Sequence, residues 1–566
     1  MNGAPTRLRK TQARIATVRR NRARDPALSF SRFLADVRGR VRREDRGGIT
    51  SLVSKAGRPV NPGWQNAGLA LCAGAMKQKT IKRLDELFAA EPDRLSRLSF
   101  EAAGIYFDWS KTHLDQDVIA QFEARADRMG FSAARNALFA GEIVNPSEGR
   151  SATHVAERGS GSPEDVELAT ARRQRMRALV DAIEAGAFGD VTGILHIGIG
   201  GSVLGPDLVV DSLGRRSSEF RVSFLSNIDG AAFDQAVKPL DPATTLIVVA
   251  SKSFTTLETI TNLKAARAWL AEAGVEDPEG RVIAITAKPE AAVDQGIDET
   301  RILQFAESVG GRYSLWSSVG LTIALALGWD AFEELLEGAA EMDRHFRFAE
   351  PTSNVPLIAA FGDRFYSEQM GCQTRALFAY DERLRLLTFY LQQLETESNG
   401  KSVTTDGKPV ANPTAPVVWG GTGTDAQHAV FQLLHQGTTL VPVEFVAVRE
   451  GDDDQDPEQH RLLLLNAFAQ GAALMQGRQA SDPQRSYSGN RPSATVLLDR
   501  LDPRSLGALI AFYEHRTFAN AVLLGINPFD QFGVELGKDI ARQLAEGAGE
   551  EGLDASTRAL IKRTGL

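Results

Sequence analysis

The sequence predicts an α/β protein built from two domains, each a mainly parallel sheet flanked by helices. Two observations lead to this prediction. Short apolar runs alternate with longer amphipathic runs, which is typical of strands and helices in a doubly wound sheet. The apolar runs are also continuous, which indicates strands that helices cover on both faces. The alternation begins near residue 190 and starts again beyond residue 346.

The apolar runs define the expected strands in chain order. In the first region, at about residues 190–320, they are Gly193–Gly198, Val222–Leu225, Thr245–Ala250 and Arg281–Thr286. In the second region they are Ala376–Tyr380, Val417–Gly420 and Val441–Val446. Helical patterns occupy Trp64–Phe88, Val118–Phe139, Asp165–Ala185 and Phe332–Glu368. One more helix begins near Pro206, and another follows the third strand and runs through Leu270. We therefore divide the chain into a basic extension (1–47), a helical N-terminal part plus the first domain (48–345), a second domain (346–525) and a C-terminal helical arm (526–566).

Composition narrows the class of protein. The chain has 566 residues, of which 43% are apolar and 24% are charged, as expected for a globular protein of two or three domains. No apolar run approaches the roughly 20 residues that span a bilayer. A net charge of −8 argues against nucleic-acid binding by the chain as a whole. The two cysteines, Cys72 and Cys372, cannot form a disulfide framework and favour the cytoplasm. The histidines and cysteines lack metal-ligand spacing, so we expect no metal site.

The N-terminus differs from the rest of the chain in its charge composition. The stretch from Arg7 to Arg24 is rich in arginine and contains no acidic residue. Transit segments share that composition, and a basic arm that touches nucleic acid or anionic lipid is an alternative. We favour a third interpretation, a disordered extension or a translation start that is assigned too far upstream.

A glycine-rich loop, Gly198–Gly205, joins the first strand to a helix. Glycines let the backbone turn tightly, and the free N–H groups of a helix N-terminus bind anions. A dinucleotide site would need glycine where Val203 stands, and no Gly-Lys-Ser/Thr follows. The loop therefore favours a small phosphate.

A hydroxyl-rich loop, Ser251–Thr256, follows the third strand and opens another helix. Clustered hydroxyl and N–H groups at that place suit a phosphate monoester. A helix N-cap rich in serine and threonine is the structural alternative. Because ligands bind beyond the carboxyl ends of strands in such sheets, both loops are expected at one ligand-binding edge.

The segment Gln392–Lys401 places a carboxylate pair and a lysine where an amphipathic helix ends at Asn399-Gly400. A carboxylate there faces the negative end of the helix dipole, which disfavours its charge. That is a plausible place for a proton-transferring base, and a solvated helix end is the alternative. Arg312, after two glycines, suits stabilisation of an oxyanion. Gln427-His428, Phe529–Gln531 and Gly537-Lys538 are weak signals singly.

Together these segments closely resemble the phosphoglucose isomerase family, in the family's order from about residue 95 to 545. The resemblance implies two sugar-isomerase (SIS) domains and the reversible conversion of glucose 6-phosphate to fructose 6-phosphate in glycolysis and gluconeogenesis. It implies no metal, no organic cofactor and a homodimer. The matching stretches are Gly198–Pro206, Ser251–Thr256, Gly310–Trp316, Gln392–Lys401, Gln427–Gly437 and Gly525–Lys538.

The resemblance also implies residue roles. Glu397 matches the base that moves a proton between C1 and C2, and Arg312 matches the residue that stabilises the cis-enediolate. His428 and Lys538 match the pair that opens the sugar ring, and the histidine comes from the neighbouring subunit. The substrate-binding positions are Gly201, Ser202, Ser251, Lys252, Ser253, Thr255, Thr256, Gln393 and Gln531.

The chain departs from the family pattern at a few positions without losing an acid, a base or a charge clamp. Ser253 replaces threonine, Thr396 replaces methionine, and Asp425-Ala426 replaces Asn-Gly before His428. Two other functions are weighed against the isomerase. A non-catalytic sugar-phosphate sensor would not need the retained catalytic set, and Val203 counts against a nicotinamide oxidoreductase.

Overall fold

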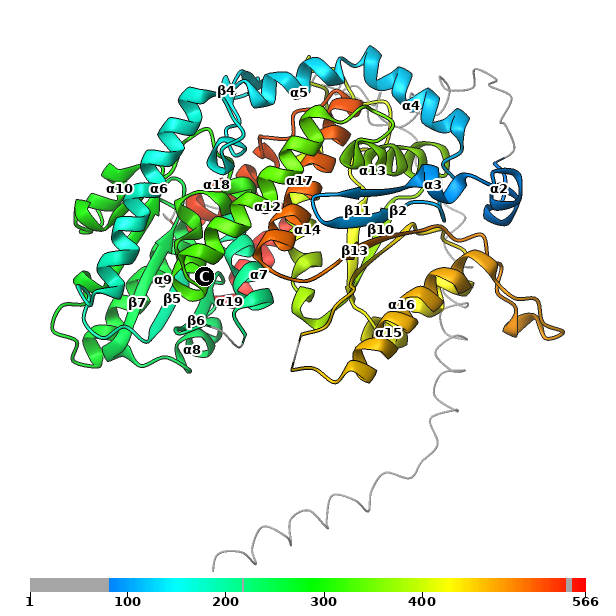
Figure 1. Cartoon of the computed structure of the whole chain (residues 1–566). Helices are drawn as coiled ribbons and strands as arrows, with labels where there is room; N and C mark the ends of the chain where they lie inside the picture. Colours follow the sequence, from blue (N-terminus) through cyan, green and yellow to red (C-terminus); the bar gives the residue numbers. More distant parts are fainter. Residues whose placement is uncertain (1–80, 216–217, 453, 546–551, 566) are drawn as a thin grey trace, which may run out of the picture. The chain divides into compact units, whose positions relative to one another are not determined.

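The computed structural model describes residues 81–215, 218–452, 454–545 and 552–565. They form an α/β structure, which confirms the predicted fold class (Figure 1). It contains two large sheets and a two-stranded antiparallel sheet of β3 (Ile143–Asn145) and β4 (Arg150–Ser151). The expected extension at residues 1–47, Cys72 and most of the expected Trp64–Phe88 helix lie outside the described residues.

The first sheet is parallel throughout and has the order β6-β5-β7-β8-β9. The four expected strands are present, and β9 was not anticipated. Every residue of β5, β7 and β8 is buried, as the continuous apolar runs require. The strands are β5 (Gly193–Ile197), β6 (Arg221–Leu225), β7 (Thr245–Ala250), β8 (Val282–Thr286) and β9 (Ile302–Gln304).

The second sheet has the order β1-β2-β13-β12-β10-β11. Strands β10 to β13 are parallel to one another, whereas β2 is antiparallel to both β1 and β13. The three expected strands are present as β10, β11 and β12. The strands are β1 (Ser99–Ala102), β2 (Ile105–Asp108), β10 (Thr374–Tyr380), β11 (Val417–Thr422), β12 (Val443–Val448) and β13 (Ser493–Leu498).

The β1–β2 hairpin lies in a segment where the sequence indicated helix alone. Ala103 and Gly104, with φ angles of +49° and +72°, form the tight turn between its strands. The hairpin extends the second sheet, and Phe107 stacks on Trp109 with ring centroids 5.5 Å apart. The second sheet is therefore built from two segments that are far apart in the sequence.

Helices flank the sheets, and α12, α14 and α17 occupy the space between them in Figure 1. Helix α17 is buried along nearly its whole length and contacts α12, α13 and α14. The helices are α2 (Leu84–Ala90), α3 (Arg94–Leu98), α4 (Gln116–Arg128), α5 (Phe131–Phe139), α6 (Pro163–Glu184), α7 (Leu204–Leu213), α8 (Gly230–Val237), α9 (Leu257–Glu272), α10 (Pro289–Val293), α11 (Leu321–Leu327), α12 (Trp329–Phe348), α13 (Val355–Arg364), α14 (Leu387–Asn399), α15 (Asp425–Gln436), α16 (Pro457–Gln476), α17 (Pro503–Leu524), α18 (Glu535–Ala545) and α19 (Ala555–Thr564).

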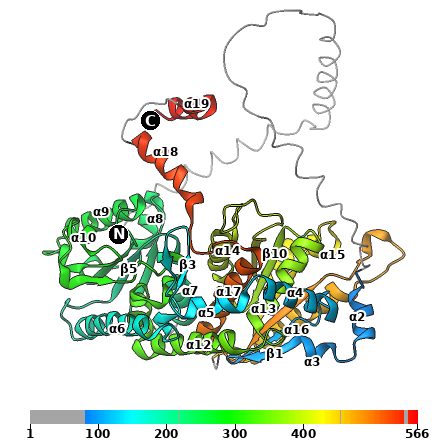
Figure 2. The ribbon, with the colours of Figure 1, turned by 90° about the horizontal axis from the view of Figure 1, so that it is seen from above.

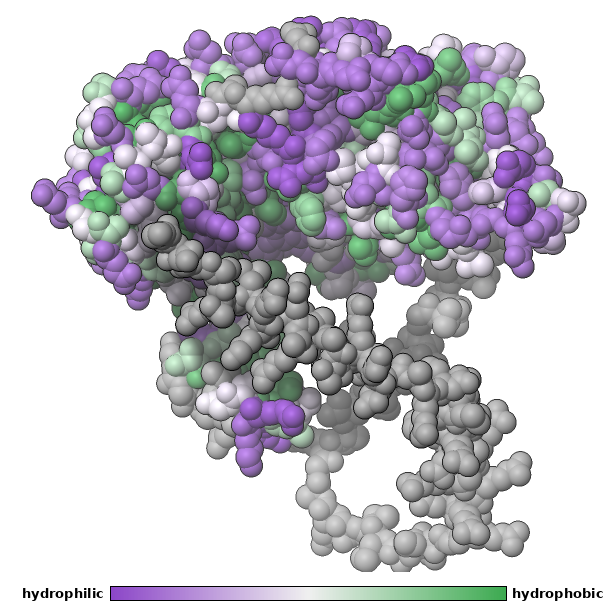
Figure 3. Space-filling model, turned by 90° about the horizontal axis from the view of Figure 1, so that it is seen from below, coloured by the Kyte–Doolittle hydropathy of each residue, from purple (hydrophilic) through white to green (hydrophobic). Residues whose placement is uncertain are grey.

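The C-terminal segment differs from the rest of the described chain in its packing. Helix α18 has no buried residue, and Figure 2 shows it extending away from the two sheets. The face of the molecule in Figure 3 is mostly hydrophilic, with apolar side chains scattered over it. Among the described helices, none is both long enough and apolar enough to cross a membrane.

Candidate active site

The glycine loop lies at the carboxyl end of β5, where it forms the short helix η3 (Gly200–Ser202) and leads into α7. It packs closely against two other elements. A Cβ on Gly200 would lie 2.7 Å from Nε2 of Gln393, and a Cβ on Gly201 would lie 2.1 Å from the carbonyl carbon of Gly311. Glycine at these positions therefore brings the loop against α14 and against η7 (Gly311–Trp316).

The hydroxyl loop lies between β7 and α9, at the same edge of the sheet. The Ser251 Oγ and Thr256 Oγ1 atoms are 3.2 Å apart, and Ser251 Oγ also accepts the Phe254 N–H. Phe254 is buried with φ at +54°, a strained conformation for an aromatic residue that is typical of functional loops. Thr256 is the N-cap of α9 but makes no side-chain capping bond, which weighs against the N-cap alternative.

Lys252 connects the hydroxyl loop to the segment that precedes Arg312. Its Nζ donates to the carbonyl oxygens of Glu307, at 2.6 Å, and Val309, at 3.2 Å. Burial lowers the pKa of Lys252, and the neighbouring Arg150 lowers it further. The ammonium group is therefore held by the backbone.

The two carboxylates at the end of α14 lie in different environments. Glu395 is buried and forms an ion pair with Arg375 in β10 of the second sheet. Glu397 lies in the last helical turn, with 21% of its side chain exposed. Its Oε2 accepts a hydrogen bond from Nε2 of Gln393 at 2.9 Å, one turn earlier in the helix. Glu397 is thus the member of the pair that faces the glycine loop and η7.

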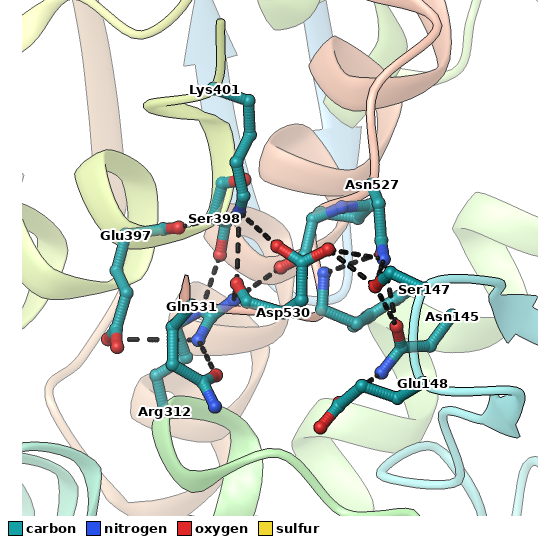
Figure 4. Close-up of polar contacts among 12 residues, drawn as sticks. Asn145, Ser147, Glu148, Arg312, Glu397, Ser398, Lys401, Asn527, Asp530 and Gln531 are labelled. Atoms are coloured by element: carbon teal, nitrogen blue, oxygen red, sulfur yellow. Dashed lines mark hydrogen bonds and ion pairs between the residues drawn. The ribbon is translucent and has the colours of Figure 1, made fainter. Parts of the chain in front are cut away.

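Arg312 is buried in η7, and its guanidinium is fixed from several sides (Figure 4). Nε donates to Ser398 Oγ at 2.6 Å, and Nη1 donates to Oε1 of Gln531 at 3.1 Å. Nη2 donates to the backbone carbonyls of Pro528 and Asp530. Nη1 also lies 3.7 Å from Oε2 of Glu397. A rigid cation therefore sits beside an accessible carboxylate, as oxyanion stabilisation requires.

Two expected site residues are not brought to this cluster. His428 is exposed in the first turn of α15, and Lys538 is exposed on α18. In the part of the chain that the structure describes, neither side chain forms a hydrogen bond or ion pair with Glu397 or Arg312. Thr424, just before α15, has φ at +44°, and the Asp425 N–H donates to the Gly423 carbonyl at 2.8 Å. This strained three-residue turn presents the helix that carries His428.

Three further residues contact this cluster without having been predicted as site residues. Ser398 holds Arg312, while Lys401 and Asp530 bond to each other and to the backbone of the cluster. A site role for Lys401 could have been suspected from the sequence, because this lysine follows the predicted helix end. Within the described ranges, no group of three or more histidine, cysteine, aspartate or glutamate side chains is placed to hold a metal ion.

Comparisons with known proteins agree with one another. The profile of the phosphoglucose isomerase family matches residues 108–561. A glucose-6-phosphate isomerase of Rhizorhabdus wittichii is 65% identical over 489 residues, which are 86% of this chain and 98% of that protein. One of Zymomonas mobilis subsp. mobilis is 57% identical over 487 residues, 86% and 96% of the two chains. The crystal structure of a glucose-6-phosphate isomerase from Chlamydia trachomatis has a TM-score of 0.79 at 31% identity, covering 86% of this chain and 96% of that one.

Proposed function

The chain belongs to the phosphoglucose isomerase family, and we propose that it interconverts glucose 6-phosphate and fructose 6-phosphate through a cis-enediolate. One observation supports this most strongly. The Glu397 carboxylate and the buried Arg312 guanidinium lie 3.7 Å apart, beside a glycine loop suited to a small phosphate ester. A base, a fixed cation and an anion site are the parts that an aldose–ketose isomerisation needs.

Glu397 is the base in this proposal. The proton on the carbon next to a carbonyl is weakly acidic, so it has to be removed by a positioned group. The carboxylate takes the proton from C2 of the open-chain aldose and returns it to C1. General base catalysis of this kind is worth on the order of 10²–10⁴-fold in rate.

Arg312 stabilises the intermediate. Removal of the C2 proton leaves negative charge on the enediolate oxygens, and a guanidinium that is already oriented needs no reorganisation to meet it. A donor in such a position is worth roughly 3–4 kcal/mol of barrier. The hydrogen bonds to Ser398, Gln531 and two carbonyls keep the guanidinium in place.

The two loops bind the phosphate, and its binding energy positions the distant carbons C1 and C2. Lys252 adds positive charge from its backbone-held place, while Gln393 and Gln531 line the sugar. The proposed phosphate-binding residues are Gly201, Ser202, Ser251, Ser253, Thr255 and Thr256.

Ring opening is assigned to His428 and Lys538. Because both side chains are exposed and neither bonds to Glu397 or Arg312 within the described residues, we infer that a second copy supplies His428 in a homodimer. We also infer a role in glycolysis and gluconeogenesis, in the cytoplasm, without a metal or organic cofactor.

A coupled assay tests the function. Purified protein is given fructose 6-phosphate, and glucose 6-phosphate is detected by the reduction of NADP by glucose-6-phosphate dehydrogenase. We expect turnover that EDTA does not change. Binding of the sugar phosphate without turnover would instead indicate a sensor.

A further inference from the structure

We propose that Lys401 and Asp530 form a positioning pair that fixes Arg312 and Glu397 relative to each other. This inference rests on the proposed isomerase function and assigns neither residue a contact with substrate. The pair joins the end of α14 to the segment Asn527–Gln531, which precedes α18 (Figure 4).

Lys401 lies just beyond the C-terminus of α14, where backbone carbonyls lack partners within the helix. Its Nζ donates to the carbonyl oxygens of Glu397, at 2.9 Å, and Ser398, at 2.8 Å. Burial lowers the pKa of Lys401, and the Asp530 carboxylate opposes that effect. A cation at this place also offsets the negative end of the helix dipole. Lys401 therefore fixes the backbone that carries the proposed base.

Asp530 contacts the same ammonium group with two of its oxygens. Lys401 Nζ lies 2.9 Å from its backbone oxygen and 3.2 Å from its Oδ1. The other carboxylate oxygen, Oδ2, accepts hydrogen bonds from Ser147 Oγ at 2.6 Å and Asn527 Nδ2 at 2.8 Å. Asp530 and Asn527 are both buried, so the segment is anchored by a polar network.

Asp530 connects this network to Arg312. Its backbone oxygen accepts from Lys401 Nζ and also from Arg312 Nη2, at 3.2 Å. The next residue, Gln531, accepts from Arg312 Nη1. The Pro528 carbonyl in the same segment accepts from Nη2 as well. A shift of the Asn527–Gln531 segment would therefore move three of the four acceptors that orient the guanidinium.

The pair thus links both catalytic groups through the backbone. On one side Lys401 holds the carbonyls of Glu397 and Ser398, and on the other Asp530 holds Arg312. Because a misplacement of about 1 Å can cost on the order of 10²-fold in rate, loss of the link should reduce turnover more than binding.

The test compares four variants of the full-length protein. Lys401→Met removes the charge at similar length, Lys401→Arg restores a cation, and Asp530→Asn removes the carboxylate charge. Lys408→Met is the matched control, since Lys408 is an exposed lysine in the following loop, paired with Asp406. The measurements are kcat and KM with fructose 6-phosphate, thermal unfolding, and crystal structures of wild type and Lys401→Met.

We expect Lys401→Met to lower kcat by roughly 10- to 100-fold with KM changed less than about threefold, and Lys401→Arg to recover most of the loss. Asp530→Asn should also lower kcat more than it changes KM, but to a smaller extent. Lys408→Met should have the kcat and KM of wild type. The proposal would be overturned if Lys401→Met had wild-type kcat. It would also be overturned if Lys401→Met reduced the amount of folded protein while the folded fraction kept wild-type kcat.

The crystal structures separate this inference from the proposed function. We expect the Arg312–Glu397 separation in Lys401→Met to differ from the wild-type 3.7 Å by about 1 Å or more. An unchanged separation would overturn the positioning role even if wild type is an active isomerase. A changed separation in a protein without isomerase activity would support the positioning role and refute the proposed function.

Discussion

The Nη1 atom of Arg312 lies 3.7 Å from Oε2 of Glu397, and this contact joins η7 to the last turn of α14. The guanidinium does not depend on this contact, because it has four hydrogen bonds to other acceptors. The second carboxylate oxygen of Glu397, Oε1, has no hydrogen-bond partner in the described structure. The carboxylate is therefore oriented by one oxygen while the other remains available to a substrate proton.

Ser398→Ala should impair catalysis through Arg312. The substitution leaves Nε of Arg312 buried without its acceptor, which costs about 1–3 kcal/mol and lowers kcat roughly 10- to 100-fold. Tyr313→Phe is the control, because it removes the bond to Ser398 Oγ but leaves that oxygen bound to Arg312. Steady-state kinetics of both variants check this, and equal losses in the two would contradict the role of Ser398.

Gly201→Ala should disrupt the site by direct overlap. The added Cβ would lie 2.1 Å from the Gly311 carbonyl carbon and 2.4 Å from the Arg312 nitrogen, so η7 or the glycine loop has to move. We expect kcat/KM to fall by about 10²-fold or more. Gly230→Ala, where a Cβ meets no atom within 4 Å, is the matched control. A fully active Gly201→Ala enzyme would show that the two loops are not in close contact.

Lowering the pH should lower the free energy of unfolding because of His196, a fully buried residue of β5. Its ring bonds the Thr322 hydroxyl and the Ser202 carbonyl of the glycine loop, and burial lowers its pKa to about 4 from 6.5. The unfolded state binds a proton below pH 6.5 that the folded state does not bind until about pH 4. The free energy of unfolding therefore decreases as pH falls through this window.

His196→Gln removes this titration. The variant is expected to be less stable than wild type at pH 8, and the difference should shrink by about 2 kcal/mol at pH 5. Urea unfolding at the two pH values measures it. A stability difference that is the same at both would show that His196 does not contribute to the pH dependence.

Mixed dimers test whether His428 acts in the site of a second copy. If it does, a heterodimer of His428→Ala and Glu397→Gln contains one site with both lesions and one intact site. We expect each heterodimer to have about half the wild-type activity, although both parent homodimers are nearly inactive. Two affinity tags isolate the heterodimer, and an inactive one would mean that each site is built from a single chain.

The sequence could place the parts of the site that lie within one element. Gln393, Glu397 and Ser398 fall within about one and a half turns of α14, so a helical pattern is enough to bring them together. The glycine and hydroxyl loops follow buried parallel strands, and that topology sets both at one edge of the sheet.

The sequence could not place contacts that depend on tertiary packing. Asp530 is 218 residues from Arg312, and its backbone oxygen, which no side-chain pattern reveals, makes the contact. The hairpin β1–β2 was missed because four-residue strands are too short to show a period. Lys252 is a predicted substrate-binding residue, but the two carbonyls to which its Nζ donates could not be predicted from the sequence.

Solvent-label incorporation tests the central claim most directly. The wild-type protein and Glu397→Gln are incubated with fructose 6-phosphate in D₂O, and deuterium at C2 of the glucose 6-phosphate formed is measured by NMR. We predict that wild type incorporates deuterium at C2 and that Glu397→Gln does so at least about 10²-fold more slowly, although it still binds the sugar phosphate. Incorporation by Glu397→Gln at the wild-type rate would contradict the assignment of Glu397 as the base.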